Sequence, residues 1–103
     1  MAQVAIVAKL TAAEGKSEEL KAVIAELVTA VDKTEPDTVI YAAAQDNDDP
    51  NVFWFYEYYG SADAAAIHAN GNALADARTT MRGLLAGRDV HVLTPVAAKG
   101  LPA

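Results

Sequence analysis

The sequence predicts an α+β fold of the ferredoxin-like type, in which four strands form an antiparallel sheet and helices cover one of its faces. Two observations predict this fold. Segments with strand character and segments with helical periodicity follow one another in the order β-α-β-β-α-β, and the strands are apolar at both parities. Because the helices leave one face bare, we expect that face to pack on a second copy, forming a homodimer with the sheet packing of a dimeric α/β barrel.

The composition narrows the class of protein. The 103 residues suit one domain, residues 1–103, in which 96–103 form a tail without periodicity. The chain has no cysteine, which excludes thiol catalysis and disulfides and suits a reducing cytoplasm. A net charge of −6 without a basic stripe argues against nucleic acid, and no segment has the character of a signal peptide or a membrane span. We therefore expect a cytoplasmic protein with no membrane or nucleic-acid partner.

The first half of the chain predicts a strand, a helix and a second strand. Residues 3–10 have few polar interruptions and suit a strand covered on both faces. A helix is expected from Ser17, as N-cap, to Lys33, because apolar residues recur at three- and four-residue spacing. These residues are Leu20, Val23, Ile24, Leu27, Val28 and Val31. Pro36 follows the helix, and residues 38–45 are expected to form the second strand.

Residues 52–59 form the most informative segment, since they hold six of the seven aromatic residues of the chain around a single carboxylate, Glu57. Aromatic and β-branched residues favour a strand, and the preceding polar turn predicts a hairpin with residues 38–45. A glutamate in the middle of such a strand is costly to bury without partners. Glu57 therefore indicates either a polar network or a functional site. The sequence leaves open which of the two alternating sets of side chains in residues 52–59 faces the helices.

The second half predicts a helical region and a last strand. Ser61 is expected to cap a helix over residues 62–69, which Asn70-Gly71 interrupts. Asn72 is expected to cap the next helix, which Gly87 ends. Its apolar stripe consists of Leu74, Ala77, Met81, Leu84 and Leu85, with Arg78 and Arg82 on the opposite side. Residues 89–95 then form the last strand.

His68 and Glu57 are the candidate catalytic residues. Histidine exchanges protons near neutral pH, and His68 lies on the helix that follows the aromatic strand, beside the break at Asn70. A packed histidine and a structural carboxylate remain the alternatives. The candidate substrate-binding residues are Trp54, Tyr56, Tyr58, Tyr41, Asn70 and Met81, whose alternative roles lie in the core, the dimer interface and the turn. His91, in the last strand, is expected to be structural or interfacial.

No metal site or cofactor is expected. The chain has two histidines and no cysteine, without pairs at ligand spacing. It also lacks a glycine-rich phosphate loop, a nucleophile elbow and a dinucleotide-binding fingerprint.

Several segments together resemble the antibiotic biosynthesis monooxygenase (ABM) domain family, and its quinol monooxygenase branch in particular, over roughly residues 3–95. They are Glu35-Pro36-Asp37-Thr38-Val39-Ile40-Tyr41, Asp49-Pro50-Asn51-Val52-Phe53, Tyr56-Glu57-Tyr58-Tyr59 with Ser61, Ala64 and His68, and Leu84-Leu85. The resemblance implies a dimeric ferredoxin-like fold with a pocket between sheet and helices. The haem-degrading branch carries an Asn in the first strand, a Trp on the helix after the third strand and a later His. Here the first strand has no Asn, and His68 and Ala77 occupy the other two positions, which argues against haem degradation.

The resemblance implies a monooxygenase that oxidises a hydroxylated aromatic compound, of the quinol or anthrone kind, with O₂ and without a cofactor. His68 would be the base, Glu57 would orient it or a substrate hydroxyl, and the aromatic residues would enclose the ring. Two alternatives remain open. One is a dimer that binds a small hydrophobic molecule without catalysis, and the other is a cofactor-free isomerase.

Overall fold

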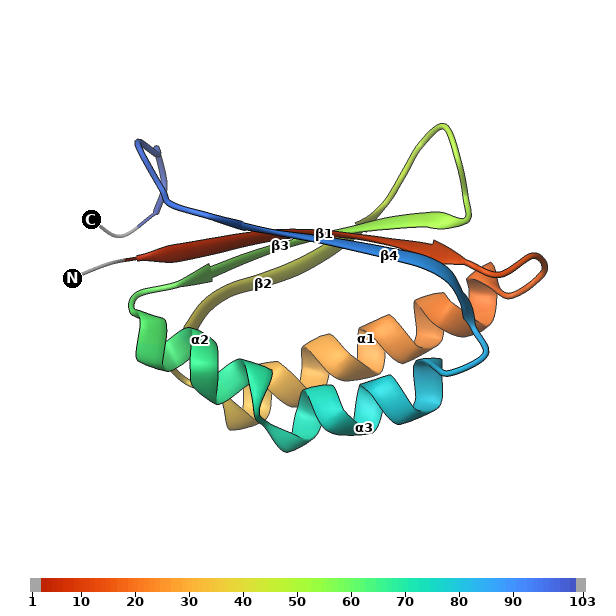
Figure 1. Ribbon diagram of the computed structural model, residues 1–103, viewed down its shortest axis with the longest axis horizontal. Coiled ribbons are helices and arrows are strands. Elements are labelled where there is room, and N and C mark those ends of the chain that lie inside the picture. The colour runs from red at the N-terminus through yellow and green to blue at the C-terminus, as the bar shows by residue number, and fades with distance from the viewer. Residues whose placement is uncertain (1–2, 102–103) are drawn as a thin grey trace.

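The computed structural model describes residues 3–101, which form four strands and three helices (Figure 1). In chain order these are β1 (Val4–Ala12), α1 (Ser17–Thr34), β2 (Thr38–Gln45), β3 (Val52–Tyr59), α2 (Ala62–Ala69), α3 (Asn72–Met81) and β4 (Leu85–Leu93). The strands form one antiparallel sheet in the order β2-β3-β1-β4, and all three helices lie on the same side of it. The ferredoxin-like α+β prediction is confirmed, with the second helical region divided in two where Asn70-Gly71 interrupts it. Within residues 3–101, no helix has both the length and the apolar character needed to cross a membrane.

The strand register decides which side chains face the helices. Phe55 lies opposite Ala8, and Glu57 lies opposite both Ile6 and Tyr41. Because side chains alternate along a strand, these positions share the helix-facing side of the sheet. The core between the two layers consists of Leu20, Ile24, Leu27 and Val31 from α1, Ala8, Leu10 and Ala12 from β1, Phe53 and Phe55 from β3, and Ala77 and Met81 from α3. Burying each large apolar side chain contributes about 1.5–3 kcal/mol, so the predicted stripe of α1 holds the helix on the sheet.

The last helix ends six residues earlier than the predicted end at Gly87. After Met81 the chain turns, and Gly83 has φ of 86°, in the left-handed region that glycine adopts without strain. Leu85 then pairs with Ala12 as the first residue of β4, and Gly87 lies within that strand. The predicted stripe was wrong at its end, because Leu84 and Leu85 contact the core from a turn and a strand.

Of the three predicted helix caps, one is confirmed. The Ser61 hydroxyl accepts a hydrogen bond from the Ala64 N–H at 3.1 Å. Ser17 and Asn72 are instead the first residues of their helices, and the cap positions Lys16 and Gly71 make no side-chain cap bond.

The face of the sheet away from the helices bears exposed aromatic side chains. Trp54 and Tyr56 are 39% and 38% exposed, and no helix covers this face in Figure 1. The Trp54 Nε1–H donates to Asp46 Oδ2 at 2.9 Å, which lowers the pKa of that carboxyl group, and Lys9 Nζ lies 5.6 Å from the centre of the indole ring. Trp54 is thus held by contacts within its own chain, on the side opposite the helices.

Candidate functional site

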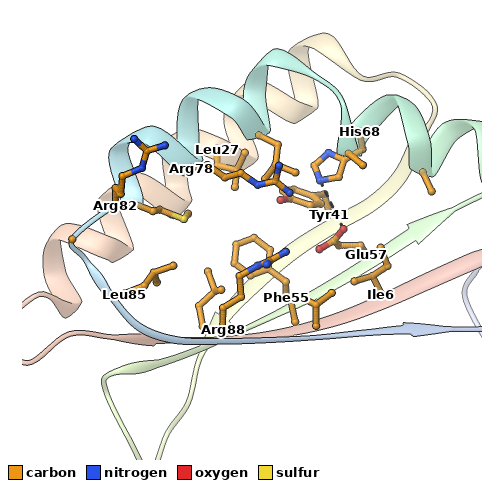
Figure 2. A pocket seen from close by; sticks show the side chains of 18 residues that line it. Ile6, Leu27, Tyr41, Phe55, Glu57, His68, Arg78, Arg82, Leu85 and Arg88 are labelled. Atoms are coloured by element: carbon orange, nitrogen blue, oxygen red, sulfur yellow. Dashed lines mark ion pairs between the residues drawn. The ribbon is translucent and has the colours of Figure 1, made fainter.

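A cleft of about 550 Å³ lies between the helices and the sheet (Figure 2). Strands contribute Ile6, Ala8, Leu10, Tyr41, Phe55, Glu57, Leu85, Arg88 and Val90, and helices and the turn after them contribute Leu27, Ala65, His68, Ala69, Leu74, Arg78, Met81, Arg82 and Gly83. Most of these side chains are apolar. Size and lining suit a flat hydrophobic ligand with a few polar groups.

The His68 ring is buried and is held at one nitrogen by a carboxylate. Its Nδ1 lies 2.7 Å from Oε1 of Glu35, whose side chain is also buried. Glu35 follows the last residue of α1, and its backbone N–H donates to Val31 O at 2.9 Å. The Thr38 hydroxyl donates to the same carboxylate oxygen at 3.3 Å. The end of α1 and the start of β2 therefore fix the acceptor that faces the imidazole.

The hydrogen bond to Glu35 selects the tautomer of the neutral His68 ring. An ionised carboxylate only accepts hydrogen bonds, so the neutral imidazole of His68 carries its proton on Nδ1. Its Nε2 is then free to accept a proton. The Tyr41 and Tyr59 rings lie against the imidazole, with centroids 4.7 and 5.7 Å from its centre. These contacts restrict the ring's orientation.

Glu57 lies on the other side of the ring. Its Oε1 is 3.9 Å from Nε2 of His68, which is too long for a hydrogen bond. The Tyr59 hydroxyl donates to the same oxygen at 2.6 Å, so the carboxylate has the polar partner that its burial demands. The expected partner of the histidine was Glu57, but the hydrogen bond is made by Glu35.

Burial raises the pKa values of groups that surround the His68 ring. It raises the pKa of the Glu57 carboxyl group, against the opposing effects of the Tyr59 hydrogen bond and of His68. Burial is also the main cause that raises the pKa of Tyr41, and it raises that of Tyr59 together with the bond to Glu57. Both tyrosines therefore keep their hydroxyl protons at neutral pH, which leaves the histidine and the carboxyl groups to exchange protons.

The break between α2 and α3 allows a close approach to Glu35. A Cβ atom at Gly71 would lie 3.2 Å from Glu35 Oε2 and 3.1 Å from the Ile67 carbonyl oxygen. Both distances are shorter than ordinary contacts, so a side chain here would displace its neighbours. Gly71 thus leaves the room that the carboxylate needs.

The predicted site residues separate into two groups. Tyr41, Glu57, His68 and Met81 line the cleft. Trp54, Tyr56 and Tyr58 have the opposite strand parity to Glu57 and lie outside this cleft, and Asn70 lies outside it too, with its side chain donating to Ala66 O at 3.0 Å. His91 is exposed, with its Nε2 3.2 Å from Asp89 Oδ2. The expectation that Trp54, Tyr56 and Tyr58 enclose the same ring as His68 thus fails for this cleft, because strand parity separates them.

Sequence reasoning assigned no role in the site to Glu35 or to the arginines. Glu35 belongs to a segment that resembles the family, but only its contact with His68 across the fold gives it a chemical role. Arg78 and Arg82 were expected on the side opposite the apolar stripe; both are exposed, and they also line the cleft together with Arg88 (Figure 2). Within residues 3–101, no three His, Cys, Asp or Glu side chains form a group suited to a metal ion.

Comparisons with known proteins agree with this fold. Among curated proteins, none matches the sequence. The solved structure of protein SO0527 from Shewanella oneidensis is 26% identical, with a TM-score of 0.87 over 94% of each chain. A protein from Caulobacter crescentus CB15, provisionally described as an antibiotic biosynthesis monooxygenase, is 25% identical, with a TM-score of 0.87 over 93% of this chain and 92% of its own. A protein of the same provisional description from Chloroflexus aurantiacus J-10-fl is 25% identical, with a TM-score of 0.81 over 97% of this chain and 99% of its own. Residues 3–80 match the family model of the antibiotic biosynthesis monooxygenases, and the chain therefore belongs to that family.

Proposed function

We propose that the protein is a cofactor-independent monooxygenase that oxidises a hydroxylated aromatic compound with O₂. The observation that carries this proposal is the buried His68, held at Nδ1 by Glu35, with Nε2 available beside an apolar cleft. A base at the edge of an apolar cavity is what the removal of a phenolic proton requires. Membership of the family supports the reaction class.

The substrate supplies the electrons in this reaction. His68 Nε2 takes the proton of a ring hydroxyl, and the resulting anion gives one electron to O₂. The substrate radical and superoxide then join at a ring carbon, and the peroxide receives the proton back from the imidazolium. For a ring CH₂ group, loss of water from the hydroperoxide leaves a C=O group, so that CH₂ and O₂ become C=O and H₂O.

The residues around the base have separate roles in this proposal. Glu35 fixes the ring and stabilises the imidazolium formed after proton transfer. Glu57, 3.9 Å from Nε2, orients the substrate hydroxyl, and Phe55 and Tyr41 contact the aromatic rings. The apolar lining excludes water from the reactive anion.

The test is O₂ consumption by chelator-treated protein with anthrones and substituted quinols. His68→Ala should lower the rate by about 10²–10⁴-fold and change ligand affinity by less than about tenfold, since its main task is proton transfer. Lys21→Ala is the control, because Lys21 is exposed on α1 and lies outside the cleft. Equal rates for the wild type and His68→Ala would overturn the proposal.

The apolar lining also favours a second candidate, a protein that binds a small hydrophobic ligand without turnover. Such a protein should bind ligand without consuming O₂. An isomerase using His68 and Glu57 would instead convert its substrate under strictly anaerobic conditions. The presence or absence of O₂ therefore separates the three activities.

We further propose that the protein acts as a homodimer joined through the sheet face away from the helices. Trp54, Tyr56 and Leu93 are 39%, 38% and 45% exposed. Large apolar side chains gathered on one uncovered sheet face favour association with the same face of a second copy.

A further inference from the structure

All three arginines of the chain line the cleft. They are Arg78, Arg82 and Arg88, while none of the five lysines lies among the lining residues. The chain has a net charge of −6, so cations are scarce on it. The concentration of all three arginines at a single cleft indicates that the cleft attracts a negatively charged ligand.

The arginines lie on opposite walls. Arg78 and Arg82 belong to the α3 side of the cleft and Arg88 to β4, and Figure 2 shows the side chains of Arg78 and Arg88 extending into the space between the walls. In the same view, Arg82 lies toward the end of the cleft away from His68. A ligand that extends along this cleft from His68 therefore meets guanidinium groups from both walls.

These guanidinium groups have no carboxylate partners within the part of the chain that the structure describes. The ion pairs there involve Lys16, His68 and His91, and none involves an arginine. Burial and the charges of Glu57 and Glu35 raise the pKa of Tyr41, and the charge of Arg78 opposes them without reversing the shift. Arg78 thus influences the interior of the cleft electrostatically while its own charge is unpaired.

We propose that the substrate carries a carboxylate in addition to its reactive hydroxyl, and that Arg78 and Arg88 bind this carboxylate. The position of the hydroxyl rests on the proposed function. A guanidinium group presents paired N–H donors that match a carboxylate in one plane. A carboxylate conjugated to an aromatic ring lies in the plane of that ring, which suits a flat ligand held between a sheet and helices.

The proposal is tested by equilibrium binding of three air-stable probes, 6-hydroxy-2-naphthoate, its methyl ester and 2-naphthol, by titration calorimetry. The acid should bind at least tenfold more tightly than the neutral probes, and its affinity should fall as salt is added. Arg78→Gln and Arg88→Gln should each weaken binding of the acid by about tenfold and change binding of the neutral probes less than twofold. Lys21→Gln, which removes the same charge from the exposed side of α1, is the control and should change neither.

Two results would overturn the proposal: equal affinity for the acid and its ester, or an unchanged preference for the acid in both arginine variants. Arg78→Lys and Arg88→Lys keep the charge but lose the paired donors, so they should retain only part of the preference. The titrations are run under anaerobic conditions, where the proposed oxygenation cannot proceed, so this result is independent of oxygenase activity. Conversely, loss of O₂ consumption in His68→Ala with an intact preference for the acid would separate the reaction from the anion site.

Discussion

Glu35 Oε1 and His68 Nδ1 lie 2.7 Å apart in the interior of the protein, although 33 positions separate the two residues in the sequence. The contact joins the end of α1 to α2. The contact makes the two ring nitrogens different, because Nδ1 is hydrogen-bonded to Glu35 and Nε2 is not. Three predictions concern this contact and its surroundings, and a fourth concerns the opposite face of the sheet.

Glu35→Gln should reduce kcat/KM by about 10–100-fold, as loss of a group that positions a catalytic residue commonly does. Removing the negative charge also disfavours the protonated imidazole, so the acidic limb of the kcat/KM profile should move to lower pH. Glu26→Gln, on the exposed side of α1, is the control. A lower rate with an unshifted pH profile would indicate a structural role for Glu35 alone.

Glu57→Gln should gain stability relative to the wild type as the pH rises. Burial raises the pKa of Glu57 above its ordinary value of 4.5, so its contribution to folding is complete below that value. This contribution is lost as the pH rises toward the folded-state pKa, because the unfolded chain ionises first. The melting temperature of the variant minus that of the wild type should therefore increase between pH 4 and pH 7. A constant or decreasing difference would contradict the raised pKa.

Gly71→Ala should destabilise the protein by about 1–3 kcal/mol and lower kcat/KM. The new methyl group would lie 3.2 Å from Glu35 Oε2, so the carboxylate must move away from it. Gly60→Ala is a matched control, since a Cβ atom there has no heavy atom within 4 Å. Thermal unfolding and steady-state kinetics measure the two effects, and equal behaviour of the two variants would argue against crowding at Glu35.

Sedimentation at micromolar concentration should give about twice the mass of one chain. Tyr56→Glu should shift the protein toward monomer, because it places a charge on the proposed interface. Ile67→Glu changes a side chain that is 54% exposed on α2, on the helical side, and should leave the dimer intact. A monomeric wild type would rule out the sheet-on-sheet arrangement under these conditions.

Local patterns were enough to predict the fold. The apolar stripe of α1 and the strand character of residues 52–59 identified elements that the structure confirms. The end of α3 was mispredicted because Leu84 and Leu85 continue the helical spacing, although the chain has already turned at Gly83. Periodicity cannot distinguish a residue on a helix from one that reaches the same core from a turn.

The site was only partly predictable for a different reason. His68 and Glu57 stand out as polar groups in apolar surroundings, which local sequence displays. The side of the sheet on which the helices pack decides which side chains of β3 line the cleft. Phe55 is on that side and Trp54 is on the other. The contact of Glu35 with His68 depends on chain segments that meet only after folding.

The connection between Met81 and Leu85 consists of three residues, and it joins the two walls of the cleft. Because Arg82 and Gly83 of this connection line the cleft themselves, the covalent chain limits how far α3 and β4 can separate there. The width of that end is thus set by the length of a loop, while His68, the proposed base, lies toward the other end (Figure 2). Insertions in this connection would admit bulkier ligands and leave the proton-transfer residues in place, so the size range of accepted molecules and the reactivity could evolve independently.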